Sequence, residues 1–219
     1  MQKILTERKE EKFMSTQGKF VTLEGCDGCG KTTQLKLLSS YLERNGVEHV
    51  FTREPGGSRI AEAIRGMILN KENKEMTDAC EALLYAAARV QHLQERVVPA
   101  LEAGKLVVCD RYIDSSYAYQ GEARGLGYEA VKEINRYARM PDLTIFLDIL
   151  PEDAFRRKRG IDENDRMELQ GLAFHQKVYE GYKKMEKREP VRFVAVNAYA
   201  SVGEIHEAIL SVMKERGIL

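Results

Sequence analysis

The sequence predicts an α/β protein in which a five-stranded parallel sheet is covered by helices on both faces. Five short apolar segments, several of them rich in β-branched residues, alternate with segments of helical periodicity. A glycine-rich loop follows the first apolar segment and precedes a helix. Such alternation is typical of parallel sheets, because each crossover connection places a helix on one face of the sheet.

The predicted strands are short and are bounded by turn residues. The first, KFVTLE, leads into the glycine-rich loop, and the second, VEHVFT, is followed by the Pro-Gly-Gly break of REPGG. The third and fourth, LVVCD and LTIFLDI, have the apolar character of buried strands. In chain order, the five strands are expected over residues 19–24, 47–52, 106–110, 143–149 and 192–198.

The helices are predicted from apolar residues that recur every three or four positions. One long helical segment is expected over residues 77–104, with Thr77 or Asp78 as its cap, Gly104 at its end and an interruption at Pro99. Another helical region begins at Pro151. The remaining helices are expected around four apolar stripes: Leu35, Leu38 and Leu42; Ile60, Ile64 and Ile68 within residues 57–70; Leu169, Leu172, Tyr179 and Tyr182; and Val202, Ile205, Ile209 and Val212.

Length and composition predict one domain over residues 18–219, preceded by a charged arm over residues 1–17. The 219 residues carry 34 basic and 34 acidic side chains, so no overall field favours nucleic acid or an acidic membrane. The N-terminus lacks the apolar stretch of a secretory signal, and no run approaches the roughly 20 apolar residues of a membrane span. The four cysteines are too few for a disulfide scaffold in a chain of this length, which favours the cytoplasm.

The glycine-rich loop GCDGCGKT matches the phosphate-binding pattern G-x-x-x-x-G-K-[ST] through Gly25, Gly30, Lys31 and Thr32. Glycines let backbone N–H groups turn toward phosphate oxygens, and the next helix points its positive end at the same place. Lys31 is expected to reach the transferred phosphoryl group and Thr32 to bind Mg²⁺. We therefore predict a P-loop that binds ATP through Gly25, Cys26, Asp27, Gly28, Cys29, Gly30, Lys31, Thr32 and Thr33.

The two cysteines of this loop also suggest half of a metal site, but the sequence has no second C-x-x-C to complete a structural zinc site. We interpret Cys26 and Cys29 as small residues that fill variable loop positions. A second hypothesis is that these thiols, beside a helix N-terminus and Lys31, are acidified and easily oxidised.

Charged residues follow two of the predicted strands. In a parallel sheet, ligands gather at the carboxyl ends of the strands. Asp110 is thus placed to hold Mg²⁺ and Arg111 to bind a phosphate, although a strand-end salt bridge would explain both. Arg53, in TREPGG, is expected at the same edge, with a simple surface turn as the alternative.

A basic, glycine-containing segment, RRKRGIDENDR, suggests a mobile lid near residues 156–166. A run of charges is usually a solvated face. A phosphoryl-transfer enzyme, however, needs positive groups to stabilise the charge on the transferring group, and a lid that closes over nucleotide would supply them.

Taken together, these motifs resemble the thymidylate kinase family, in its bacterial form. The resemblance runs from about Gly18 to the C-terminus and is carried by FVTLEGCDGCGKTTQ, TREPGG, LLYAAARVQH, DRYIDSSYAYQG, PDLTIFLD and DRME. It implies the fold of P-loop nucleotide hydrolases, Mg²⁺-dependent transfer of the γ-phosphoryl group of ATP to dTMP, and a homodimer.

The resemblance also implies roles for individual residues. Asp27 would meet the acceptor nucleotide or its metal, and Arg53 and Arg111 would hold the acceptor phosphate. The nucleoside pocket would be formed by Tyr85, which stacks on the base, Arg89, which contacts it, and Ser115, Ser116, Tyr119 and Gln120. On the ATP side, Arg157, Arg159 and Arg166 would be lid arginines, and Asn197 and Ala198 would lie near the adenine. Some family members carry a catalytic arginine where this chain has Gly28, so here the lid is expected to supply that charge.

Other functions remain open from the sequence. Another nucleoside monophosphate kinase would share most of these motifs. A deoxynucleoside kinase would need a base for a sugar hydroxyl, for which Glu24 is the near candidate. A P-loop regulatory NTPase would need a water-positioning residue and switch loops, and no clear candidates for these are found in the sequence.

Overall fold

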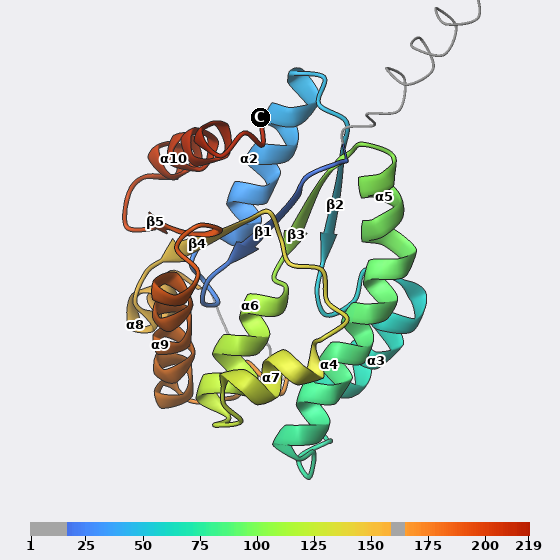
Figure 1. Ribbon diagram of the computed structural model, residues 1–219. Coiled ribbons are helices and arrows are strands. Elements are labelled where there is room, and N and C mark those ends of the chain that lie inside the picture. The colour runs from blue at the N-terminus through green and yellow to red at the C-terminus, as the bar shows by residue number, and fades with distance from the viewer. Residues whose placement is uncertain (1–16, 159–164) are drawn as a thin grey trace, which may run out of the picture.

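In the computed structural model, which describes residues 17–158 and 165–219, five parallel strands form one sheet in the order β2-β3-β1-β4-β5 (Figure 1). The strands are β1 (Phe20–Glu24), β2 (His49–Arg53), β3 (Leu106–Asp110), β4 (Leu143–Asp148) and β5 (Phe193–Asn197). All five predicted strands and the α/β class are confirmed, and strand ends shift by two residues at most. The expected arm lies outside the described residues except for Gln17.

Strand β1 shows how the sheet divides the core into two layers. Side chains alternate between its faces, so Phe20 packs into one apolar cluster, whereas Val21 and Leu23 pack into the other. Helices α2 (Lys31–Arg44) and α10 (Val202–Glu215) cover the face of Val21. The face of Phe20 is covered by the helices that follow β2 and β3 and by α9 (Leu172–Arg188).

The long helical segment after α3 (Arg59–Leu69) is interrupted as predicted. Helix α4 (Asp78–His92) passes into a π-helical turn, η1 (Leu93–Val97), and then into α5 (Val98–Glu102). Pro99 lies in the first turn of α5, two residues after η1 ends, and it has no N–H to donate to the preceding turn. The predicted cap is confirmed, because Thr77 Oγ1 accepts a hydrogen bond from the Cys80 N–H at 3.3 Å.

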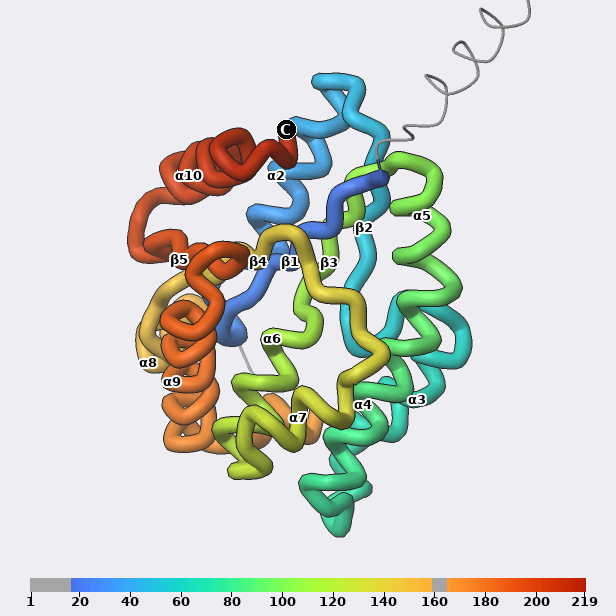
Figure 2. Tube along the Cα trace, in the orientation of Figure 1, coloured from blue at the N-terminus to red at the C-terminus, as the bar shows by residue number. Residues whose placement is uncertain are grey.

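The segment between β3 and β4 holds three helical elements for which no prediction was made. They are α6 (Ile113–Ser116), the π-helical η2 (Tyr117–Ala123) and α7 (Tyr128–Ile134). Tyr117, Tyr119 and Gln120 of η2 are all buried, so this element has no apolar stripe opposed to a polar face. Figure 2 follows the chain from α7 back along the sheet to the start of β4.

Three predicted stripes extend beyond their helices or out of the core, and one of them is the stripe of α10, where Val202 is 52% exposed. Leu169 was expected on the same helix as Tyr182, but α9 begins at Leu172 and Leu169 is half exposed in the preceding loop. Ile60 lies on α3, yet 40% of its surface is exposed. The helical region predicted from Pro151 is α8 (Pro151–Arg157).

The strand register brings the predicted functional segments to one edge of the sheet. Leu23 of β1 and Arg53 of β2 are both aligned with Asp110, the last residue of β3. The P-loop, the TREPGG segment and the residues after β3 therefore all emerge from the carboxyl edge, as expected for a ligand site in a parallel sheet.

Candidate active site

The P-loop connects β1 to α2 and folds around the side chain of Lys31. Gly25, Gly28 and Gly30 all have positive φ angles, of 146°, 86° and 105°, which side-chain-bearing residues rarely adopt. The Lys31 ammonium donates to the carbonyl oxygens of Gly25 at 3.0 Å and of Cys26 at 3.4 Å. The lysine thus lies against the loop, and Thr32 and Thr33 are exposed at the start of α2.

Gly28 is a P-loop position that has no room for a side chain. A Cβ atom there would approach the Ala154 carbonyl oxygen of α8 to 2.2 Å. This contact is with backbone, so a side chain would require α8 to shift. The positive charge near the loop is therefore supplied by Lys31 and by Arg111, which bonds to Asp27.

The loop cysteines are packed into the core. Cys26 and Cys29 are free, almost fully buried, and belong to the apolar cluster beneath the Val21 face. Burial, followed by the neighbouring Cys29, raises the pKa of Cys26 to about 12. The acidified-thiol hypothesis is therefore wrong for Cys26. Within residues 17–158 and 165–219, no group of three or more His, Cys, Asp or Glu side chains could hold a metal ion.

Thr32 and Asp110, the residues predicted to bind Mg²⁺, line the same open groove beside the P-loop. One carboxylate oxygen of Asp110, Oδ1, is buried and has no hydrogen-bond partner in the described part of the chain. A buried acceptor beside a free hydroxyl suits Mg²⁺, which is usually held by one or two protein groups together with substrate phosphates. Arg53 lines this groove as well, and it forms a half-exposed ion pair with Glu62 at 2.9 Å.

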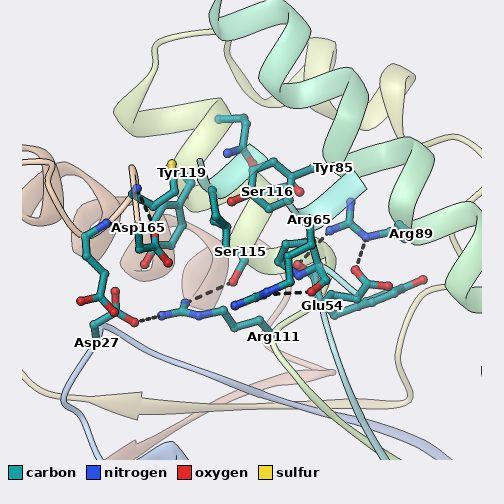
Figure 3. Close-up of a pocket in the computed structure, with 16 residues that line it drawn as sticks. Asp27, Glu54, Arg65, Tyr85, Arg89, Arg111, Ser115, Ser116, Tyr119 and Asp165 are labelled. Atoms are coloured by element: carbon teal, nitrogen blue, oxygen red, sulfur yellow. Dashed lines mark hydrogen bonds and ion pairs between the residues drawn. The ribbon is translucent and has the colours of Figure 1, made fainter. Parts of the chain in front are cut away.

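A second cavity opens beside the P-loop and brings together most of the residues predicted to bind the acceptor nucleotide (Figure 3). Helix α4 contributes two of them, the segment after β3 contributes the rest, and Asp27 reaches in from the P-loop. The predicted residues that line it are Asp27, Tyr85, Arg89, Arg111, Ser115, Ser116, Tyr119 and Gln120. Arg53 is the exception, because the groove described above holds it and it does not line this cavity.

Arg111 connects the cavity to the P-loop. Its Nη2 donates to Asp27 Oδ1 at 2.6 Å, and its Nη1 donates to Ser115 Oγ at 3.4 Å and to the Tyr182 hydroxyl at 3.2 Å. Burial alone would raise the pKa of Asp27, but the charges of Arg111 and Lys31 outweigh it and hold that pKa well below its usual range. Arg111 and Asp27 therefore form a charged pair between the two ligand sites.

Arg89 is held in place on three sides. Its Nε donates to Glu54 at 2.8 Å, one Nη group donates to Asn135, and the other donates to the Tyr112 carbonyl at 3.2 Å. A guanidinium has five N–H groups, so two remain for a ligand. Ser116 Oγ, also at the cavity, is buried with no partner in the described chain.

Several residues at the cavity were not predicted. Arg65 of α3 lines it, half-buried, and donates to the Pro55 carbonyl at 2.9 Å. Burial and then the charge of Arg53 lower the pKa of Arg65. An arginine in the middle of a helix carries no sequence signal that separates it from a surface residue. Glu54, by contrast, lies within TREPGG and holds both Arg89 and His92.

The predicted ATP-side residues are only partly assembled. Arg157 of α8 donates to the Ala198 carbonyl at 2.6 Å, and Asn197 is exposed at the end of β5. Arg159 lies outside the described residues. Arg166 was expected to reach ATP, but it is buried against Glu81 of α4 and donates to the Ile68 carbonyl at 3.0 Å. Arg166 thus pairs with a buried carboxylate that also accepts from Gln120, a residue of the acceptor cavity.

A P-loop at the carboxyl edge of a parallel sheet, with a polar cavity next to it, defines a nucleotide-binding protein with room for a second ligand. A family model, thymidylate kinase, matches residues 23–209. Two similar relatives carry that name. One, from Clostridium novyi, is 49% identical over 90% of this chain and 99% of its own, and one, from Thermoanaerobacter sp., is 47% identical over 91% and 98%. The chain belongs to the thymidylate kinase family.

A solved structure agrees with this assignment. The crystal structure of thymidylate kinase from Ehrlichia chaffeensis superposes with a TM-score of 0.72 at 30% identity, over 90% of this chain and 98% of that one. Among the helices that the structure describes, none combines the length and apolar character needed to cross a membrane.

Proposed function

We propose that this chain transfers the γ-phosphoryl group of ATP to dTMP, giving dTDP and ADP. The observation that carries this proposal is the position of Arg111. Its guanidinium lies in the acceptor cavity and is bonded to Asp27 of the P-loop. A phosphate bound at Arg111 would therefore lie next to the phosphates cradled by the loop, which is the arrangement that phosphoryl transfer requires.

The main obstacle to this reaction is the repulsion between two polyanions. Lys31 and Arg111 supply positive charge on either side of the transfer point, and Arg65 adds a third cation at the cavity wall. No protein nucleophile is needed, because an oxygen of the acceptor phosphate attacks the γ-phosphorus directly. Charge stabilisation and alignment together account for the catalysis that this site can provide.

Mg²⁺ suits the pair formed by Thr32 and Asp110. The unpartnered Asp110 Oδ1 supports this assignment, since a buried carboxylate oxygen without a partner is costly unless a ligand satisfies it. When bound, the ion would neutralise charge on the β- and γ-phosphates of ATP. Arg157 and, at the end of β5, Asn197 and Ala198 remain our proposed contacts for the rest of ATP.

The acceptor nucleotide is proposed to lie with its phosphate at Arg111 and its base toward α4. Arg89 keeps two N–H groups for the base, and the free Ser116 hydroxyl adds a group that can donate or accept. The ring of Tyr85 lines the same end and offers a stacking surface. We further propose that Gln120, whose amide donates to Glu81, is a second polar group at this end.

The structure weakens the deoxynucleoside kinase alternative. Such an enzyme needs a base near a sugar hydroxyl, and Glu24 was the candidate. Glu24 is fully buried, and both of its carboxylate oxygens are occupied by hydrogen bonds from Tyr112, Ser115 and Tyr182. A regulatory NTPase is disfavoured by the second polar cavity, which such a protein would not require.

A coupled assay of ADP release tests the function. The purified chain, with ATP and Mg²⁺, is assayed against dTMP, dUMP, UMP, CMP, AMP and thymidine. We expect turnover with dTMP to exceed that with any ribonucleotide by at least about 100-fold, since an unmatched polar group in a recognition site is penalised strongly. Equal rates with and without an acceptor would instead favour a regulatory NTPase.

We also propose a homodimer that forms through α3 and α4. Ile60 and Met67 of α3 and Leu83 and Val90 of α4 are exposed by 40%, 55%, 57% and 36%, and each pair is seven residues apart on its helix. Seven residues are nearly two turns, so each helix presents an apolar stripe, and the two helices pack against each other. We expect Leu83→Asp to shift the chain from dimer to monomer in light scattering. Val202→Asp, at a 52% exposed valine on α10, is the control that should not.

The remaining parts of the proposal concern partners and location. The balanced charge gives no basis for a nucleic-acid or membrane partner. The four cysteines are all free, and such thiols persist in a reducing compartment, which supports a cytoplasmic location.

A further inference from the structure

Glu24, the last residue of β1, is a fully buried carboxylate in the centre of the molecule. Side chains alternate along β1, so Glu24 lies on the same face as Phe20 and points toward α6 and α9. A buried carboxylate is costly unless its oxygens are satisfied. Its partners here show what it holds in place.

All the hydrogen-bond partners of Glu24 are neutral, and all lie beside Arg111. Oε1 accepts the backbone N–H of Tyr112 at 2.7 Å. Oε2 accepts the Ser115 hydroxyl at 2.7 Å and the Tyr182 hydroxyl at 2.9 Å. The same two hydroxyl oxygens accept from Nη1 of Arg111. Glu24 is therefore linked to the Arg111 guanidinium through a single bridging hydroxyl group, either that of Ser115 or that of Tyr182.

The direction of these hydrogen bonds depends on the carboxylate. Each hydroxyl has one proton and two lone pairs. When both hydroxyls donate to Oε2, their lone pairs are left to face Nη1 of Arg111. A group that donates at the position of Oε2 would turn the hydroxyl protons away from Glu24 and toward the guanidinium or each other.

Glu24 also supports the backbone of Arg111. Arg111 has a φ of 64°, the single positive value among the described non-glycine residues. Its own N–H donates to the Leu23 carbonyl at 3.0 Å, and the next N–H, of Tyr112, donates to Glu24. The end of β1 thus anchors the peptide groups on both sides of this uncommon conformation.

We propose that Glu24 is a positioning residue for the acceptor phosphate: it fixes the backbone turn at Arg111 and orients two hydroxyl groups that hold the guanidinium in the cavity. The inference rests on the proposed function, because it takes Arg111 as the group that binds the phosphate. It assigns Glu24 no contact with substrate. Tyr182, which does not line the cavity, becomes a second positioning residue through the same network.

The test separates binding of the phosphate from binding of the nucleoside. Affinities for dTMP and for thymidine are measured by calorimetry without ATP at about pH 8.5, where Glu24 is ionised, on the full chain and on Glu24→Gln, Tyr182→Phe and Tyr179→Phe. Tyr179 is a matched control, because it is also on α9 and near Phe146, but its hydroxyl bonds to Asp148. We expect Glu24→Gln to weaken dTMP binding about tenfold and thymidine binding less than about twofold.

Tyr182→Phe should act in the same direction, by about threefold, because one of the two hydroxyl supports of Arg111 remains. Tyr179→Phe should leave both affinities unchanged. Loss of dTMP and thymidine affinity in equal measure in Glu24→Gln, or no loss of either, would overturn the proposal. If Glu24→Gln does not fold, the comparison of Tyr182→Phe with Tyr179→Phe decides in the same way.

Failure of the proposed function would look different. If the wild-type chain binds thymidine as tightly as dTMP, Arg111 does not bind the acceptor phosphate. This result would contradict the proposed function independently of any effect of Glu24→Gln. If the wild-type chain prefers dTMP to thymidine and Glu24→Gln keeps the same preference, only the positioning role of Glu24 is refuted, and the proposed function stands.

Discussion

The acceptor cavity and the ATP side of the site are built differently. Around the cavity, charged groups hold one another: Arg89 is bonded to Glu54, Arg111 to Asp27, and Arg166 to Glu81. On the ATP side, Thr32 and Arg157 are exposed, and Asp110 Oδ1 has no partner among the described residues. The acceptor side is thus formed before ligand arrives, whereas the ATP side presents a loop, exposed side chains and one unpartnered carboxylate oxygen among the described residues.

This difference predicts two kinds of mutational effect. A substitution at the cavity breaks a buried network, so it should lower the free energy of unfolding together with acceptor binding. A substitution at the P-loop removes a group that mainly contacts the nucleotide, so it should lower activity with little change in stability. The following predictions test this contrast.

The largest effect is expected at the P-loop lysine. Lys31→Ala should lower kcat by about 100- to 1,000-fold, as for the loss of other groups that stabilise transition-state charge. Its ammonium bonds, within the described part of the chain, to the Gly25 and Cys26 carbonyls and to the Cys29 thiol, and it forms no ion pair there, so the melting temperature should change little. Steady-state kinetics and thermal melts on the same sample check both parts. A near-normal kcat would contradict the assigned role.

Glu24 should make stability depend on pH. Burial, then the charge of Asp114, raise the pKa of Glu24 from 4.5 to about 7, against the lowering effect of Arg111, Ser115 and Tyr182. Between these pKa values the folded state binds the extra proton, so the contribution of Glu24 to stability is fully present below about pH 4.5 and is lost as the pH rises through about 7. The change amounts to about 3 kcal/mol.

Urea unfolding of the wild type and Glu24→Gln from pH 4.5 to pH 8 isolates this contribution. Glutamine does not titrate, so the difference in unfolding free energy should move in favour of the variant as the pH rises. The other groups that face this site, Asp114, Arg111 and Tyr182, are present in both chains and cancel to first order. A difference that stays constant with pH would contradict the assignment.

Arg166 distinguishes the two sides directly. Glu81 is buried, and in Arg166→Met its carboxylate would lose one of its two arginine partners while Arg124 and Gln120 still bond to it. We therefore expect Arg166→Met to destabilise the fold by about 2 kcal/mol. The KM for ATP should change less than about twofold, whereas Arg157→Met should raise it. Urea titration and steady-state kinetics provide the two readings. A raised KM for ATP with normal stability would return Arg166 to the lid.

The fold could be predicted from the sequence because its elements are set by local patterns. Each strand is a short apolar run between breakers, and each long helix carries an apolar stripe. Among the elements that were missed, α6 and α7 are short, with four and seven residues, and η2 lacks a polar face because Tyr117 to Gly121 are all buried. The position of η2 depends on packing against α9, as shown by Gly181, where a Cβ would reach 2.7 Å from Ala118 Cα.

The site was predictable where a residue lies in a motif and much less so where tertiary contacts decide. Lys31, Thr32 and Asp110 follow from the loop and the strand ends. The pairing of Arg166 with Glu81 could not be predicted from local sequence, because the two residues are 85 positions apart in the chain, and the ATP contact of Arg166 stays a prediction. Arg65 and the network of Glu24 could not be found, since nothing local distinguishes a buried charge from a surface one.

Arg53 gives the smallest expected effect and the sharpest test of the contrast. It lines the groove of Thr32 and Asp110 outside the acceptor cavity, although it was predicted to hold the acceptor phosphate. Its ion pair with Glu62 is half exposed, so Arg53→Ala should change stability by less than about 0.5 kcal/mol. We expect the KM for dTMP to rise about tenfold and that for ATP less than twofold.

Glu62→Gln is the control for Arg53, because it removes the same ion pair and keeps the guanidinium. It should leave the KM for dTMP within about threefold of wild type, since a surface pair contributes little. If Arg53→Ala raised the KM for dTMP and the KM for ATP equally, Arg53 would contact both nucleotides from the groove that it lines with Thr32 and Asp110. The boundary between a preformed acceptor side and an open ATP side would then lie at the end of β2, between Arg53 and Glu54, which supports Arg89 at the cavity.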